Sequence, residues 1–252
     1  MNLWRRISGF FSSGNSKSSD STLESCQQVI GYTFNKLDLL HQSLSHRSIA
    51  RANGSQSSNE RLEFLGDSAL GLIIAAKLFE DYPESDEGDL TKLKAMLVNE
   101  TTLSMVAIEI GLNKHILLSS DEEKSGGRQR PSIVSDAFES VIGAVYLDGG
   151  IDSARDLVLR TIYSRHAKIV TDATLLNFKG ELLEWSQSKG RGLPTYQVVS
   201  EAGPDHDKKF RVAVYIGDEA LGQGEGFSKK EAEQHAARDA LMKLGIDCTP
   251  EL

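Results

Sequence analysis

Apolar residues recur every three or four positions from residue 23 to about residue 168. This spacing places them on one face of a helix, and no strand-like alternation interrupts it. Stretches rich in Gly, Pro, Asn and Ser separate the apolar runs. The pattern therefore predicts an all-α domain. Its clearest runs are Leu62, Leu65, Ala69, Leu72, Ile73 and Ala76, then Leu90, Leu93 and Leu97, then Val134, Phe138, Val141 and Val145.

A different pattern follows the polar stretch 171–177. Residues 178–188 keep helical spacing, whereas 196–200 and 210–216 have the composition of strands, and 220–226 form a third strand-like stretch broken by glycines. A last helix is expected over residues 228–244, because Ser228 and Glu231 have the spacing of a capping box. The order α-β-β-β-α predicts a small α+β domain after the all-α domain, a mixed fold class.

The chain of 252 residues has room for two such domains. We expect a disordered tail at 1–22, the all-α domain at 23–170, a linker at 171–177 and the α+β domain at 178–247. The tail lacks the apolar core of a signal peptide, and no later stretch reaches the ~18 apolar residues of a membrane span. With two cysteines that have no ligand or redox spacing, the sequence predicts a cytoplasmic protein without a membrane partner.

Acidic residues carry the candidate chemistry. Glu60, Glu63 and Asp67 are spaced three and four apart, so a helix would project all three from one face. Asp136 and Glu139 form a second pair among apolar residues on a helix expected over 133–147. An isolated helical acid is usually solvated or ion-paired, and Glu60 could simply pair with Arg47 or Arg61. Glu63 with Asp67 and Asp136 with Glu139 form two tight acidic pairs on apolar helices, without His or Cys nearby. Such pairs favour a site for a hard cation: Mg²⁺, with Mn²⁺ as the alternative.

Residues 59–68 are NERLEFLGDS, a stretch that resembles the signature of the bacterial ribonuclease III family. His46-Arg47-Ser48, the run that begins at Glu87, and the stretch 135–144 match further motifs in the family's order. The resemblance covers the chain from about residue 23 to its end.

This resemblance implies a metal-dependent endoribonuclease that hydrolyses double-stranded RNA to 5′-phosphate products. By position, it implies metal ligation by Glu63, Asp136 and Glu139, and a catalytic role for Asp67 and Glu139. Glu60 and Glu87 match supporting positions around the active site. The family acts as a homodimer and needs no organic cofactor, so we expect both here, with ribosomal precursors and structured mRNA as substrates in ribosomal RNA maturation and mRNA processing.

Residues 193–196 are LPTY and residues 222–234 are GQGEGFSKKEAEQ. With these stretches the second domain resembles a double-stranded-RNA-binding domain, which recognises the A-form shape of the duplex. The resemblance implies RNA contacts by Lys179, Glu184, His206, Lys229, Lys230 and Gln234. The chain has Gly180 and Leu183 where the family often has Thr and Gln. Residues 179–245 contain 10 Lys and Arg against 11 Asp and Glu, which predicts modest RNA affinity that falls steeply with salt.

Two other functions compete with this interpretation. A regulator or structural ribosomal protein could use the same fold to bind duplex RNA without cutting it, although such a protein would gain nothing from repulsive carboxylates. A metal-dependent hydrolase of small phosphorylated molecules could use the acidic cluster, although it would not need the second domain. The net charge of −8 does not decide between them, because local patches determine phosphate contact.

Overall fold

The computed structural model describes residues 16–52, 57–171, 177–204 and 208–246. The chain divides into two compact units, Met1–His166 and Ala167–Leu252, and each is described by itself. Among the described residues, no helix has both the length and the apolar character needed to cross a membrane.

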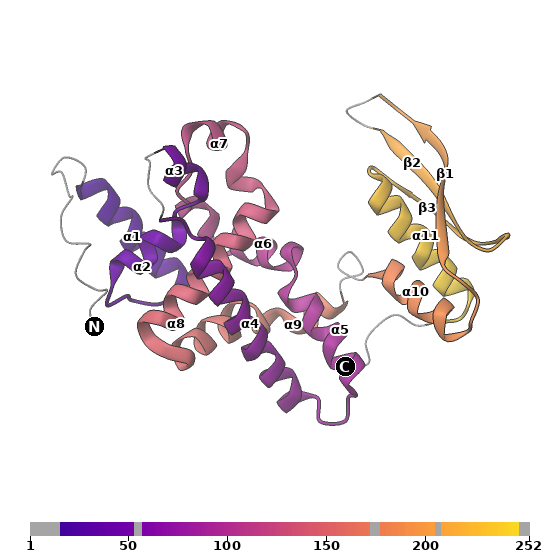
Figure 1. The fold of residues 1–252 in the computed structure, drawn as a ribbon, viewed down its shortest axis with the longest axis horizontal. Helices are drawn as coiled ribbons and strands as arrows, with labels where there is room; N and C mark the ends of the chain where they lie inside the picture. The colour runs from indigo at the N-terminus through magenta and orange to yellow at the C-terminus, as the bar shows by residue number, and fades with distance from the viewer. Residues whose placement is uncertain (1–15, 53–56, 172–176, 205–207, 247–252) are drawn as a thin grey trace. The chain divides into compact units, whose positions relative to one another are not determined.

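The first unit is helical, as the periodicity predicts (Figure 1). Its α-helices are α1 (Ser16–Ile30), α2 (Leu37–Leu44), α3 (Arg47–Ala52), α4 (Glu60–Asp81), α5 (Glu87–Val98), α6 (Glu100–Glu109), α7 (Ser120–Lys124) and α8 (Pro131–Thr161), and α9 (His166–Thr171) follows across the boundary between the units. Short 3₁₀ helices lie at Leu112–His115, Gly127–Gln129 and Tyr163–Arg165. Helix α1 includes residues 16–22, the end of the segment that we expected to be a disordered tail, and residues 1–15 lie outside the described part.

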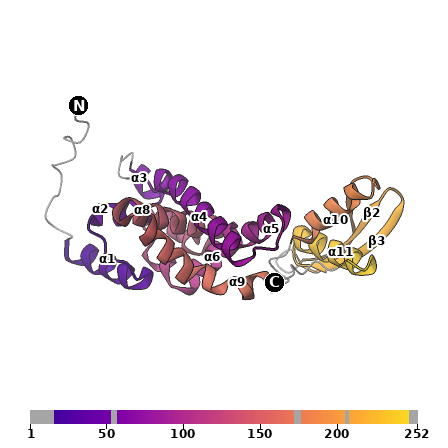
Figure 2. The ribbon, with the colours of Figure 1, turned by 90° about the horizontal axis from the view of Figure 1, so that it is seen from below.

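Helix α8 is the centre of this unit. It packs most extensively against α4, and α2 and α6 also contact it, as Figures 1 and 2 show. The residues Val134, Phe138, Val141 and Val145 are fully buried, so the predicted periodic face is the core face. The helix continues beyond residue 147, where we expected it to end. It bends at Gly150, whose positive φ of 80° lets the chain turn and start a second helical segment.

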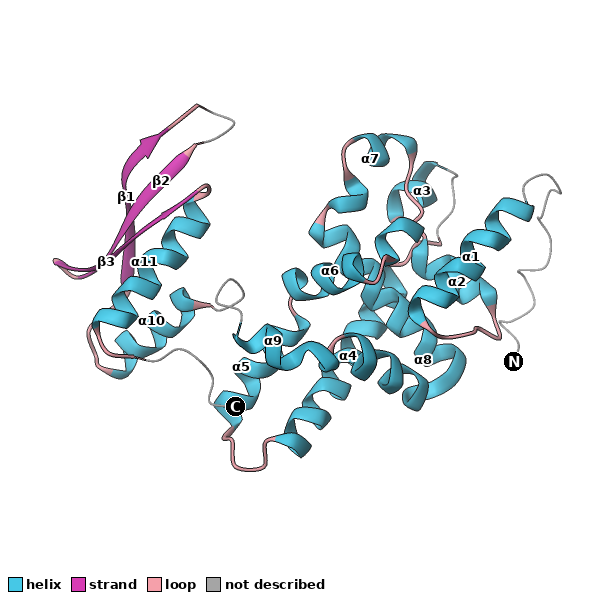
Figure 3. Ribbon diagram, turned by 180° about the vertical axis from the view of Figure 1, so that it is seen from behind, coloured by secondary structure: helices cyan, strands magenta, loops and turns pink. Residues whose placement is uncertain are grey.

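The second unit contains a three-stranded antiparallel sheet with two helices (Figure 3). Its elements are α10 (Phe178–Ser188), β1 (Pro194–Ala202), β2 (Lys209–Ile216), β3 (Glu219–Gly226) and α11 (Lys229–Lys243). This order confirms the predicted α-β-β-β-α arrangement. The core consists of residues from both helices and the inner side of the sheet: Phe178, Leu182, Val212, Val214, Ile216, Leu221, Ala232, Ala236, Ala237, Ala240 and Leu241.

The glycines that break the third strand pattern lie where β3 meets α11. A Cβ atom on Gly224 would lie 2.2 Å from the backbone nitrogen of Ala236, so only glycine permits this approach. The predicted cap of α11 is also present, because the Ser228 side chain accepts a hydrogen bond from the Glu231 N–H at 3.1 Å. The Glu231 carboxylate in turn accepts the N–H of Phe227 at 2.7 Å, one residue earlier than in a standard capping box. These contacts fix the position of Lys229 at the end of the sheet.

Candidate active site and RNA-binding surface

Helices α4 and α8 cross at close range because each has a glycine at the crossing. A Cβ atom on Gly66 would lie 1.8 Å from the carbonyl oxygen of Glu139, and one on Gly143 would lie 2.3 Å from the carbonyl oxygen of Leu62. Both distances are sterically forbidden, so the two backbones can meet only because both residues are glycine. The crossing places the acidic turns of α4 and α8 next to each other.

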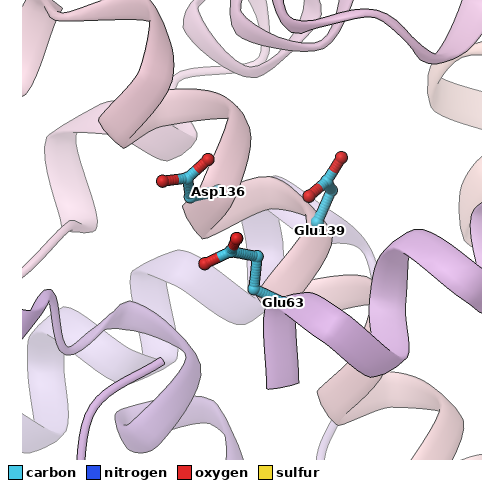
Figure 4. Close-up of side chains that lie close together, drawn as sticks. All are labelled: Glu63, Asp136 and Glu139. Atoms are coloured by element: carbon cyan, nitrogen blue, oxygen red, sulfur yellow. The ribbon is translucent and has the colours of Figure 1, made fainter. Parts of the chain in front are cut away.

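Three carboxylates meet at this crossing. Glu63 extends from α4, whereas Asp136 and Glu139 extend from α8 (Figure 4), and one oxygen from each lies within 4.8 Å of the others. All three residues are half-buried. The structure thus brings together the three residues for which the family resemblance implied metal ligation.

Burial and mutual repulsion raise the pKa of all three carboxyl groups. The pKa of Glu139 rises from 4.5 to about 8, first through burial and then through the charges of Asp67, Asp136 and Glu63. Burial is also the largest cause for Glu63 and Asp136, and Arg47 lowers both pKa values without outweighing it. A bound cation would offset the burial and the mutual repulsion of the charged carboxylates. Because the donors are all carboxylate oxygens, the site fits a hard divalent cation.

The other predicted acidic residues differ in their relation to this cluster. Asp67 is exposed one turn beyond Glu63, and it is not one of the three clustered ligands, although its charge contributes to the raised pKa of Glu139. Glu60 lies 4.0 Å from the guanidinium of Arg47 and accepts a hydrogen bond from Ser58 at 2.7 Å. Arg47 is thus the partner of Glu60.

Glu87 is the first residue of α5. Its carboxylate accepts a hydrogen bond from the Thr91 hydroxyl at 3.1 Å, which is a contact within its own helix. The structure therefore gives Glu87 a local role at the start of α5, and its supporting role at the active site stays a prediction.

Sequence reasoning missed two features of this site. Glu100 begins α6, and its charge is the largest contribution from any neighbouring residue to the raised pKa of Asp136. This proximity depends on how α6 packs on α8, so no local spacing indicates it. The close approach at Gly66 and Gly143 could have been suspected, because each glycine follows a predicted ligand by one helical turn.

In the second unit, two of the predicted RNA-contact residues also join the helices. The Lys179 ammonium pairs with the Glu233 carboxylate at 2.5 Å and lies 4.6 Å from the ring centre of Tyr196. The Gln234 side chain accepts the backbone N–H of Lys179 at 3.1 Å and donates to Asn177 at 3.2 Å. Both side chains therefore have structural partners within the unit.

The other predicted RNA contacts are surface residues where the structure describes them. Lys229 and Lys230 are exposed at the start of α11, and Glu184 is exposed on α10. His206 lies outside the described residues. The Lys229 side chain is 59% exposed against 33% for Lys179, and it also pairs with the Glu201 carboxylate at 3.4 Å.

Comparison with known proteins connects both units to one family. A family model described as Ribonuclease-III-like matches residues 36–166, and a model of the double-stranded RNA binding motif matches residues 178–244. Ribonuclease 3 of Nocardia farcinica is 48% identical over 210 residues, which cover 82% of this chain and 87% of the relative. Ribonuclease 3 of Clostridium perfringens is 43% identical over 226 residues, or 90% of this chain and 95% of the relative.

The chain belongs to the ribonuclease III family. A solved nuclease domain of ribonuclease III from Campylobacter jejuni is 41% identical, with a TM-score of 0.54, and covers 56% of this chain and 96% of that domain. Membership confirms the predicted family and the class of endoribonuclease acting on double-stranded RNA. The ribonuclease III signature stretch, residues 59–68, begins α4 and carries both Glu63 and Gly66 to the crossing. The roles of individual side chains stay predictions.

Proposed function

We propose that this chain hydrolyses duplex RNA at the cluster of Glu63, Asp136 and Glu139, which holds a divalent cation. The observation that supports this most directly is the gathering of three half-buried carboxylates within 4.8 Å at the α4–α8 crossing. Their raised pKa values mean that the fold keeps these charges together at a cost. A protein that only bound RNA would gain nothing from keeping these carboxylates together, whereas a metal-dependent hydrolase needs them as ligands.

The proposed mechanism divides the work among four acidic residues. Glu63, Asp136 and Glu139 supply oxygen ligands that suit Mg²⁺, with Mn²⁺ as the alternative. When bound, the cation stabilises charge on the phosphoryl group and lowers the pKa of water. Asp67 lies on the exposed side of the cluster, where its carboxylate can orient the attacking water. Hydrolysis breaks the bond between phosphorus and the 3′ oxygen, so the product carries a 5′ phosphate.

We propose that the second unit holds the duplex mainly through Lys229 and Lys230. Both are exposed at the amino end of α11, where ammonium groups and backbone N–H groups together favour phosphate. Lys179 and Gln234 belong to the same proposed surface, but each would have to contact RNA while keeping or exchanging its partner in the unit. Glu184 and the loop of His206 complete the predicted contacts.

A homodimer belongs to the same proposal. Helix α4 exposes Phe64, Leu72 and Phe79 to 77%, 62% and 75%. Their spacing of eight and seven residues places them on one side of the helix. Such an apolar stripe is suited to burial against a second copy. The nuclease domain from Campylobacter jejuni is described as having a region involved in dimer formation.

The proposal extends to RNA substrates and cellular roles. We propose ribosomal precursors and structured mRNA as substrates, in ribosomal RNA maturation and mRNA processing. A cytoplasmic location stays a prediction of the sequence.

The direct test incubates the purified chain with a labelled RNA duplex and with a single strand of the same sequence. Each RNA is tested with Mg²⁺, with Mn²⁺ and with a chelator. We expect the duplex alone to be shortened, and only when a metal is present. Retention of an uncut duplex under all conditions would instead support a non-cleaving RNA-binding protein, and hydrolysis of small phosphate esters without duplex binding would support the other hydrolase.

A further inference from the structure

A carboxylate occupies the space between two lysines at the edge of the proposed RNA-binding surface. Glu201, near the end of β1, accepts the Lys208 ammonium at 2.7 Å on one oxygen and faces the Lys229 ammonium at 3.4 Å with the other. Both ammonium groups also lie over the Phe210 ring, 5.8 and 5.6 Å from its centre. One glutamate thus bridges two cations that come from different elements of the unit.

The backbone fixes this arrangement. Glu201 is directly opposite Phe210 in the β1–β2 ladder, and Phe210 is opposite Gly226 in the β2–β3 ladder. At Gly226 a Cβ atom would lie 2.7 Å from the backbone nitrogen of Ala232, so the strand end lies against the first turn of α11. The register of the sheet and the close packing of β3 against α11 therefore place the backbones of Glu201 and Lys229 near each other.

We propose that Glu201 is an internal competitor of the RNA phosphate for Lys208 and Lys229, and that it limits how tightly the unit holds duplex RNA. This inference rests on the proposed RNA-binding function of the unit. A carboxylate and a phosphodiester both present two anionic oxygens to an ammonium group. With Glu201 in place, the three side chains carry a net charge of +1 instead of +2, and a phosphate that approaches either lysine meets a like charge.

The strength of this competition follows from exposure. The side chains of Glu201 and Lys208 are 35% and 36% exposed, and that of Lys229 is 59% exposed. Ion pairs at such positions are weak and screened by salt, so we expect loss of the Glu201 charge to tighten binding about three- to tenfold at low salt.

The test measures equilibrium binding of the full chain to a duplex of about 24 base pairs, longer than the ~16 that one such domain spans. A chelator prevents cleavage, and the salt concentration is varied. We expect Glu201→Gln to bind more tightly than the wild type, with the gain shrinking as salt rises. The matched control is Glu219→Gln, which also removes one paired carboxylate, because Glu219 pairs with Arg191 at 2.5 Å near the opposite end of β2. This control should change the affinity little.

A second comparison tests whether the gain passes through the lysine pair. Glu201→Gln in a Lys208→Met background should tighten binding less than it does in the wild type, because one of the released cations is absent. Unchanged or weaker binding by Glu201→Gln would overturn the inference, as would an equal gain from Glu219→Gln, which would reveal a general charge effect. Failure of the wild type itself to bind the duplex would contradict the proposed RNA-binding function, and with it this inference.

Discussion

Substitution of Gly66 by alanine should disrupt the active site without altering any acidic residue. The added methyl group would lie 1.8 Å from the Glu139 carbonyl oxygen and 2.9 Å from the Gly143 nitrogen, both backbone atoms of α8. Ordinary contact begins at about 3.4 Å, so the helices would have to separate by roughly 1.6 Å at the crossing. Neither neighbour is the flexible end of a side chain, so rotamer changes cannot relieve the clash.

The expected cost has two parts. Overpacking of a well-packed core typically costs about 1–3 kcal/mol, which in a unit of this size lowers the melting temperature by roughly 3–10 °C. The separation also displaces Glu63 from Asp136 and Glu139. Mg²⁺ requires ligands at about 2.1 Å in a nearly ideal octahedron, and a misplacement of about 1 Å can cost ~100-fold in rate. We therefore expect duplex cleavage to fall by two orders of magnitude or more.

The matched control is Gly71→Ala in the same helix. Its Cβ atom would meet only the flexible end of the Lys94 side chain, at 3.6 Å, and alanine favours a helix by up to about 1 kcal/mol over glycine. Thermal unfolding and duplex cleavage should be measured for both variants. A Gly66→Ala protein that melts and cuts like the wild type, or a Gly71→Ala protein that is equally damaged, would refute the role assigned to the crossing.

Three further predictions concern charge, pH and assembly. Lys229→Ala combined with Lys230→Ala should weaken duplex binding and flatten its salt dependence by about one unit of slope per lost phosphate contact; an unaltered slope would remove these lysines from the interface. Because the pKa of Glu139 is raised from 4.5 to about 8, this carboxyl group keeps a proton in the folded metal-free protein that it loses in the unfolded chain between these values. Its contribution to the melting temperature in chelator should therefore fall as pH rises through this window, while Mg²⁺ affinity rises; a Glu139→Gln protein whose melting temperature has the same pH slope as the wild type would contradict this. Phe79→Ser should shift the chain towards the monomer in sedimentation experiments, and a homodimer of wild-type stability would exclude the α4 stripe as its interface.

The sequence predicted those features that depend on local spacing. The burial of Phe138, Val141 and Val145 follows from helical periodicity, and the three-stranded order of the second unit follows from its turns and strand composition. The acidic pairs were visible because Asp136 and Glu139 lie on one helical face. Their spacing among apolar residues favoured a shared metal site with Glu63 and Asp67, and the resemblance named the ligands; that α4 and α8 cross there is not recorded in the periodicity.

Other features depend on packing that no local pattern records. Leu72 belongs to an apolar run, yet it is 62% exposed. Periodicity identifies an apolar helix face, but it does not say whether that face packs in the core or against a second protein chain. Gly224 looked like a break in a strand, but β3 continues through it, and its lack of a side chain allows α11 to pack against the strand. The pairing of Glu201 with Lys208 and Lys229 likewise depends on strand register and on the position of α11.

The central claim is that the half-buried carboxylate cluster cuts duplex RNA and does not merely shape the fold. It is tested most directly by measuring binding and cleavage of one labelled duplex by the wild type and by Glu139→Gln, in Mg²⁺ and in chelator. We predict nearly equal binding by both proteins, and cleavage to 5′-phosphate ends by the wild type in Mg²⁺ alone, with loss of activity by orders of magnitude in the variant. Equal loss of binding and cleavage would make Glu139 a structural residue, and unchanged cleavage by the variant would contradict the account.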